Sequence, residues 1–262
     1  LDLSKNGYAK IFELGINSPE VLFAVEFKSS VIDHAYDAYV RPSGDTKELG
    51  KQVYSGFVPT SELVDSYEMA GDGGNFSWEK HGKDPYANRE PRFYATILYN
   101  GADWMGRKIE SFVGGKDGYK AYENAGAAGT TVTGYYLRKY LIDGDKTWVT
   151  SGSGQDWIVL RYAEVLLNKA EALAMENWNK NSAEALQALN DVRARVGLPA
   201  RATADKETFL EYVRHERKVE LAGEGFRYWD LRRWRLAEKV IDGQNVHCLL
   251  YTSPSPRDRT RS

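Results

Sequence analysis

Regularly spaced carboxylates occur in the segment Phe209–Trp234, which reads FLEYVRHERKVELAGEGFRYWDLRRW. Glu216, Glu220 and Glu224 recur every four residues, so a helix would align them along one face for as long as it persists. Two carboxylates that flank a sugar cleft, about 5 Å or about 6.5–9.5 Å apart, can hydrolyse a glycosidic bond. The arginines around these glutamates would hold them ionised, however, which suits ion pairs better than general-acid catalysis.

Aromatic rings and further arginines accompany these carboxylates. Guanidinium groups stack on the faces of tryptophan and tyrosine, and a solvated helix would not require so many rings. Trp229 and Trp234 are more typical of a core than of ligand platforms, and Asp230 is more typical of a buried arginine partner. The predicted structural cluster of ion pairs and aromatic rings comprises Glu216, Arg217, Glu220, Arg227, Trp229, Asp230, Arg232, Arg233 and Trp234.

Motifs for other kinds of catalysis are missing from the sequence. The four histidines are scattered without the HExxH spacing of a zinc site, and Cys248 is the one cysteine. The segment Asp143–Trp148 begins like a calcium loop but has Trp148 in place of the loop's glycine. The GDGG turn at Gly71–Gly74 lacks the lysine of a phosphate-binding loop. We therefore expect no metal, no cofactor and no catalytic residue.

Aromatic residues make up 13% of the chain, which favours a carbohydrate ligand. Their flat faces match the apolar C–H faces of sugar rings, while the edges of tyrosine and tryptophan can still hydrogen-bond. We expect ligand-binding residues in the irregular N-terminal part, because variable sites lie on loops that a scaffold holds. Trp78 and Trp148 are the preferred platforms, and a structural role stays open for Trp104. The candidate ligand-binding residues are Trp78, Trp148, Trp104, Tyr119, Tyr122 and Asn75.

Hydrophobic spacing divides the chain into an irregular part and a helical part. Residues 1–156 are rich in Gly, Tyr, Ser and Asp, and the apolar runs Val21–Phe27 and Ala95–Tyr99 predict short strands. Residues 157–247 show the three-four spacing of helices. The predicted helices are a short one over Ser61–Ala70 and longer ones from Trp157 through Leu173, from Ser182 to Val196, from Lys206 to Ala222 and from Tyr228 to Val240.

The first two of the long helices predict an antiparallel hairpin of the tetratricopeptide type, with a link of about five residues. The two later helices would cap this hairpin, and the Gly223–Glu224–Gly225 break would force a turn between them. The predicted fold class is therefore mainly α, with a tetratricopeptide-like hairpin, capping helices and a loop-rich N-terminal half that contains short strands.

Length, charge and hydropathy narrow the function classes. A chain of 262 residues with 42% hydrophobic residues can bury a substantial core. A formal net charge of −2 argues against a nucleic-acid-binding protein, which normally carries a basic patch. No run of about 18 apolar residues occurs, so we expect no membrane-spanning segment.

Five segments of the chain resemble the SusD/RagB family, and they occur in the family's order. The longest is Glu216–Trp234, ERKVELAGEGFRYWDLRRW, which is similar to the family's C-terminal signature. The others are Asn17–Phe27 (NSPEVLFAVEF), Asn88–Tyr99 (NREPRFYATILY), Gly134–Tyr140 (GYYLRKY) and Val159–Leu173 (VLRYAEVLLNKAEAL). The resemblance covers about residues 17–243, and its length indicates a C-terminal portion of a family member.

The resemblance implies a non-catalytic surface lipoprotein of Bacteroidetes that binds an oligosaccharide and delivers it to a SusC-like TonB-dependent transporter. It implies an outer-membrane location through a lipid anchor whose signal and cysteine this chain lacks. A peptide-binding member of the same family is one alternative. The others are a carbohydrate-active hydrolase and a helical-repeat adaptor for protein partners. None of the family's ligand-contacting aromatic residues matches a motif here, so none is transferred.

The last segment of the chain differs in composition from the rest. Residues 248–262 read CLLYTSPSPRDRTRS, with Ser, Pro and Arg and no apolar periodicity. We interpret them as a non-native tail that resembles translated vector sequence, with a native disordered tail as the alternative. The predicted parts are therefore the loop-rich residues 1–156, the helical residues 157–247 and this tail.

Overall fold

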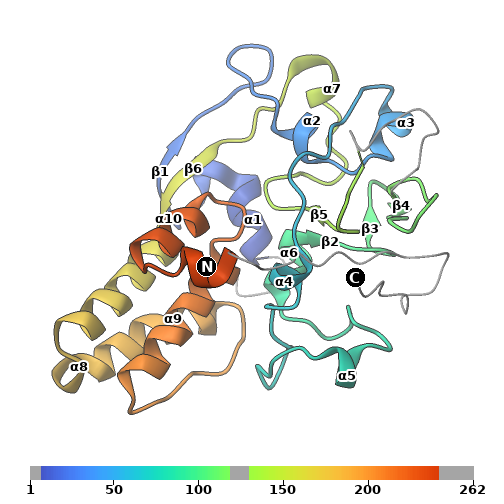
Figure 1. The fold of residues 1–262 in the computed structure, drawn as a ribbon. Coiled ribbons are helices and arrows are strands. Elements are labelled where there is room, and N and C mark those ends of the chain that lie inside the picture. Colours follow the sequence, from blue (N-terminus) through green and yellow to red (C-terminus); the bar gives the residue numbers. More distant parts are fainter. Residues whose placement is uncertain (1–6, 119–129, 242–262) are drawn as a thin grey trace.

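The computed structural model describes residues 7–118 and 130–241. Figure 1 shows α8, α9 and α10 gathered at one side of the molecule and the loop-rich segments at the other. These described residues are mainly helical with a few short strands, which confirms the predicted fold class. The elements in chain order are α1 (Gly7–Leu14), η1 (Gly15–Asn17), β1 (Val21–Val25), α2 (Tyr36–Val40), α3 (Asp45–Leu49), α4 (Ser61–Val64), α5 (Trp78–His81), α6 (Pro91–Thr96), β2 (Ile97–Leu98), β3 (Asp103–Trp104), β4 (Arg107–Lys108), β5 (Tyr136–Leu137), α7 (Trp148–Ser151), β6 (Trp157–Arg161), α8 (Tyr162–Arg195), α9 (Lys206–Glu220), α10 (Phe226–Arg233) and α11 (Ala237–Ile241).

An antiparallel pair of strands, β1 and β6, joins the two predicted parts of the chain (Figure 1). Val25 pairs with Trp157 and Val21 pairs with Arg161. The predicted helix start at Trp157 is therefore wrong, because the helix begins at Tyr162. The β-branched pair Ile158 and Val159 suits a strand, and β1 supplies the backbone hydrogen-bond partners that such a strand needs.

The longest helical element, α8, folds back on itself as a hairpin. Lys169 Nζ and Glu184 Oε1 lie 2.7 Å apart, although a straight helix would separate the two Cα atoms by about 22 Å. The reversal occurs at Asn177, whose φ of −161° and ψ of 94° are not helical. The predicted hairpin therefore forms with a tighter link than expected. Its assignment to the tetratricopeptide type stays a prediction.

Small side chains allow the two arms of this hairpin to approach closely. Ala170 and Ala174 on the first arm and Ala185 and Ala188 on the second are buried. Helix α9 covers the hairpin with a row of apolar side chains that begins at Phe209. The apolar stripe predicted from helical spacing therefore forms the core of this side of the molecule.

The helices after the hairpin follow their predicted boundaries in part. Helix α9 begins after Asp205, whose carboxylate accepts a hydrogen bond from the Thr208 amide, as an N-cap should. The turn between α9 and α10 is confirmed, since Gly223 and Gly225 have φ values of 77° and 88°. The continuous fourth helix is wrong: α10 and α11 are separate, and Arg235 between them has a left-handed φ of 56°.

Elements of the N-terminal part are shorter than predicted. Strand β1 ends two residues before Phe27, and α4 covers only the start of the Ser61–Ala70 segment, after the Thr60 cap. Within Ala95–Tyr99 only Ile97 and Leu98 form a strand, preceded by α6, which has Pro91 at its first position. Over the described ranges, no helix is long and apolar enough to cross a membrane.

Candidate functional site

The regularly spaced glutamates of α9 lie in a buried network of ion pairs. Glu220 contacts Arg92 at 2.9 Å and Arg161 at 2.6 Å, and Glu216 contacts Arg92 at 2.5 Å. We call the connected set the central ion-pair network. In the described ranges its carboxylates are Glu20, Glu68, Glu90, Glu216, Glu220 and Glu224, and its cations are Arg92, Lys139, Arg161, Arg193, Arg195 and Arg201.

Six carboxylates therefore face six cations, so the formal charges of this network cancel. Burial alone would raise the pKa of Glu220, but Arg195, Arg161 and Arg92 hold it well below its usual range. A general acid needs the opposite shift, because it must keep its proton near neutral pH. The arrangement therefore favours structural ion pairs, as the sequence predicts.

The rest of the predicted structural cluster divides between buried and exposed positions. Arg217 donates to Asp230 at 2.8 Å, and both side chains are buried. Arg233 pairs with Glu171 and Asp230, and the Trp234 indole also donates to Glu171. These contacts connect α10 to α8 and α9, so this portion of the cluster holds the last helices in place.

Arg233 is itself 41% exposed, and three further members of the predicted cluster lie near the surface. The prediction of a core position for Trp229 is wrong, because its side chain is 64% exposed, with its ring edge-to-face against Tyr228. Arg232 is exposed and donates to the Tyr228 hydroxyl. Arg227 is half-buried, and this burial lowers its pKa. Helix α10 therefore carries its aromatic and basic residues on both faces.

Two of the predicted ligand platforms, Trp104 and Trp148, surround a buried arginine. The Arg41 guanidinium lies 5.3 Å from the centre of the Trp104 ring and 5.2 Å from that of Trp148. The Trp104 indole also donates to Asp45 at 3.0 Å. Trp148 is 2% exposed and Trp104 is fully buried, so neither ring offers a face to a sugar in this conformation. Their burial instead supports Arg41, which follows α2 directly.

The other predicted ligand-binding residues lie apart from these two. Trp78 in α5 is half-buried, and its indole donates to Asp65 at 2.7 Å. Asn75 is exposed in the loop before α5. Tyr119 and Tyr122 lie outside the described residues. The structure therefore does not gather the predicted residues into one site.

Exposed aromatic rings gather instead around α2. Tyr36 and Tyr39 lie one helical turn apart on α2, and the Tyr39 ring stacks on Tyr54 with their centres 5.1 Å apart. Tyr36, Phe57 and Trp157 line two adjoining hollows of about 450 and 320 Å³. Phe57 is 62% exposed at their edge. We call this region the aromatic groove.

Local hydrogen bonds hold the walls of the aromatic groove. The Tyr54 amide donates to the Ala38 carbonyl and the Gly56 amide donates to the Tyr39 carbonyl, both at 2.7 Å. These bonds tie the loop that carries Phe57 to α2. Across the groove the Trp157 ring stacks on the buried Tyr140, with their centres 4.9 Å apart. The rings are therefore positioned before any ligand arrives, which lowers the entropy cost of binding.

Polar groups border one end of the aromatic groove. His34 lines the smaller aromatic hollow and also a third hollow of about 450 Å³, which Asp33, Lys51 and Ser153 line as well. The His34 ring uses both nitrogens, because Nδ1 accepts from the Tyr36 amide and Nε2 lies 2.9 Å from the Gln155 carbonyl. Apolar ring faces beside hydrogen-bonding groups are the usual lining of a small-molecule site.

Sequence reasoning missed the residues of the aromatic groove. A local signal was present, since Tyr36 and Tyr39 in HAYDAYV are spaced to share one face of a helix. A second signal was the pair of rings on either side of Gly56 in VYSGFVP. Trp157 has no such signal, because its predicted helix would have placed it elsewhere. The groove depends on the approach of α2, the loop after α3 and β6.

Comparisons with known proteins agree on one family. The SusD family model matches residues 19–261, a range that includes most of the predicted tail. The SusD-like protein P38 of Formosa agariphila is 32% identical over 133 residues, which are 47% of this chain and 25% of that protein. This curated relative is therefore much longer than the matched region.

Two solved structures from Bacteroides fragilis have similar folds. One is a SusD-like protein with a TM-score of 0.77 and 27% sequence identity. The match covers 97% of this chain and 50% of the chain in that structure. A protein described as a SusD-like carbohydrate-binding protein has a TM-score of 0.71 at 27% identity, covering 90% and 50%. The chain thus spans about half the length of these two structures, and none of the three relatives is described as an enzyme. With nearly its whole length matched by the family model, the chain belongs to the SusD family.

Proposed function

We propose that this protein binds an oligosaccharide without hydrolysing it, and that the aromatic groove is its binding surface. The observation that carries this proposal is a set of exposed rings: Tyr39 on α2, and Tyr54 and Phe57 on the loop after α3, which backbone hydrogen bonds hold against α2. Ring faces of this kind stack on the apolar faces of sugars. A similar structure described as a SusD-like carbohydrate-binding protein supports the ligand class.

In the complete protein, the bound oligosaccharide would pass to a SusC-like TonB-dependent transporter at the outer-membrane surface. This part of the proposal rests on family membership. Co-purification of the full-length protein with the product of an adjacent transporter gene tests it. A full-length protein that stays in the cytoplasm and has no such neighbouring gene would contradict it.

Substitution of Phe57 tests the position of the site. Loss of about 60 Å² of stacked ring surface, at about 25 cal/mol/Å², weakens binding by about 1.5 kcal/mol, or about tenfold in Kd. Calorimetry or affinity electrophoresis with a glycan panel measures this change for Phe57→Ala. The matched control is Phe23→Ala, because Phe23 is 57% exposed on β1 and does not line the groove.

The outcome of that experiment separates the alternatives. If Trp78→Ala weakens glycan binding and Phe57→Ala does not, the site lies near α5 with Asn75, as the sequence predicts. If peptides bind in the groove and glycans do not, the protein belongs to the peptide-binding branch of the family. Turnover of an oligosaccharide would favour a hydrolase, although the central ion-pair network keeps Glu220 ionised and buried.

A further inference from the structure

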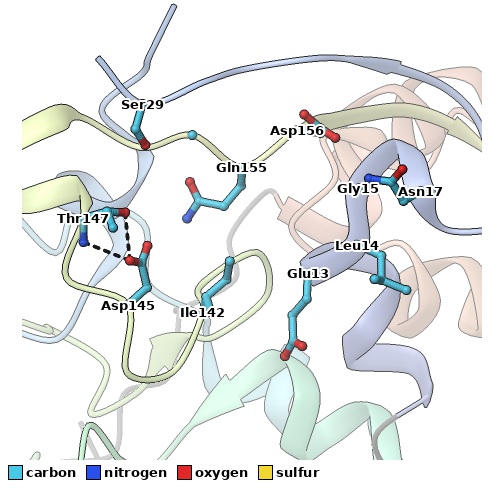
Figure 2. Close-up of a pocket in the computed structure, with 11 residues that line it drawn as sticks. Glu13, Leu14, Gly15, Asn17, Ser29, Ile142, Asp145, Thr147, Gln155 and Asp156 are labelled. Carbon is cyan, nitrogen blue, oxygen red and sulfur yellow. Dashed lines mark hydrogen bonds between the residues drawn. The ribbon is translucent and has the colours of Figure 1, made fainter. Parts of the chain in front are cut away.

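A second cavity lies between α1 and the loop before β6, and its lining residues differ from those of the aromatic groove. It has a volume of about 530 Å³, which is large enough for a monosaccharide or a disaccharide. Glu13 and Leu14 line it on the α1 side, and Figure 2 shows Asp145 and Thr147 on the opposite side. We call it the acidic cavity.

The charge of the acidic cavity has one sign. Glu13, Asp145 and Asp156 line it, and among the residues that the structure describes no lysine, arginine or histidine does. Arg41 lies behind the loop and donates to the Asp145 and Ile142 carbonyls, but the carboxylates of Asp37 and Asp45 compensate its charge. The cavity therefore attracts a cation.

The carboxylates keep hydrogen-bonding capacity for a ligand. Asp145 accepts from the Thr147 amide and hydroxyl through Oδ1 alone. Asp156 accepts one backbone amide on each oxygen, and each oxygen retains a further lone pair. Glu13 is exposed at the rim, and its carboxylate has no hydrogen bond or ion pair within the described part of the chain.

An independent observation is the buried amide of Gln155. This residue is 9% exposed, and its Oε1 has no hydrogen-bond partner in the ranges that the structure describes. Its Nε2 must face Asp37 and the Tyr140 carbonyl, because both are acceptors, so the free atom is the oxygen. Figure 2 shows the Gln155 side chain pointing into the space between Ser29 and Asp145. A buried acceptor without a partner is costly, and a donor from a ligand would satisfy it.

The arrangement distinguishes an organic cation from a metal ion. No group of three acidic, histidine or cysteine side chains in the described ranges lies close enough to hold a metal. The carboxylates instead surround the cavity from different elements. A primary ammonium group carries three hydrogen-bond donors and no acceptor, which complements a lining of carboxylate and amide oxygens.

We propose that the acidic cavity binds a small organic molecule that carries a protonated primary amine. Glu13 and Asp145 supply the attracting charge, and Gln155 Oε1 accepts one hydrogen bond from the ligand. An amino sugar and the amino end of a short peptide share this chemistry. The proposal does not depend on glycan binding in the aromatic groove, since the two surfaces have no lining residue in common.

Titration with glucosamine at pH 6 and low salt tests the proposal, because the amine is then protonated. Glucose is the neutral control, and glycylglycine amide is the peptide arm. We expect glucosamine or glycylglycine amide to produce saturable calorimetric heats or NMR shifts, at least about tenfold tighter than glucose. Added salt should weaken this binding. Whichever amine binds identifies the source of the ammonium group.

A matched pair of variants places the binding in the cavity. Glu13→Gln removes one charge at the rim without removing a contact, and Glu79→Gln removes the same charge on α5, away from the cavity. We expect about fivefold weaker amine binding for Glu13→Gln and unchanged binding for Glu79→Gln. Failure of both amines to bind, binding no tighter than that of glucose, or equal effects of the two variants would overturn the proposal. Phe57→Ala should leave amine binding intact, so failure of the groove proposal would be seen separately.

Discussion

Neutralising Glu220 should destabilise the fold strongly. Its Oε1 contacts Arg161 and Arg195, its Oε2 contacts Arg92, and the side chains of Glu220 and Arg92 are fully buried. In Glu220→Gln the amide NH₂ must face a guanidinium, so a donor meets a donor. The charge balance of the central ion-pair network is also lost, which leaves one uncompensated positive charge in the interior. Breaking a buried pair in this way costs about 3–5 kcal/mol.

Thermal or urea unfolding, followed by tryptophan fluorescence, measures this loss. For a chain of this size, each 1 kcal/mol lowers Tm by about 2–4 °C, so we expect a fall of about 6–20 °C. The control is Glu211→Gln, because Glu211 pairs with Arg214 at the surface and should lose less than about 1 kcal/mol. Equal losses in the two variants would refute the reasoning that the buried network stabilises the fold.

Three further predictions concern the buried residues Glu220, Lys139 and Trp104. Arginine partners hold the pKa of Glu220 below 4.5 in spite of its burial. The stability that Glu220 contributes is therefore complete above pH 4.5 and is lost as the pH falls below this value. Urea midpoints of the wild type and of Glu220→Gln at pH 6 and pH 3.5 measure this loss. Burial lowers the pKa of Lys139 from 10.5 to about 8, so the unfolded state binds the proton more tightly than the folded state. The free energy of unfolding should therefore rise by up to about 3 kcal/mol between pH 8 and 10.5. Lys139→Met should remove this rise, which urea midpoints of the variant and the wild type at pH 7.5 and 9.5 measure. Trp104→Phe should lose about 1–3 kcal/mol of unfolding free energy, because Asp45 loses its buried indole donor; an unchanged Tm would contradict this.

Local patterns predicted the helical side of the molecule well. The start of α9 at Lys206 and the Gly223–Glu224–Gly225 break depend on residues within a few positions of one another. Such interactions are visible in a sequence because the helical repeat fixes which side chains share a face. The break at Arg235 was missed, since a left-handed arginine has no strong local signal.

Long-range packing decided the candidate sites. The sequence indicated that Glu216 and Glu220 would pair with arginine, but their partner Arg92 lies more than 100 residues away and could not be chosen by spacing. Burial was equally hidden for the aromatic rings. Trp148 has polar neighbours in sequence and is nevertheless enclosed by Arg41 and the surrounding chain.

The sequence by itself determined the family resemblance and the mainly helical fold class, and it predicted that the α9 carboxylates pair with arginine. These properties follow from local spacing and from side-chain chemistry that holds wherever the segment lies. The tertiary structure alone decided which aromatic rings face solvent and which oxygen of Gln155 lacks a partner. The physical reason is that exposure and hydrogen-bond satisfaction depend on what the rest of the chain places beside each group, and neighbours in space are seldom neighbours in sequence.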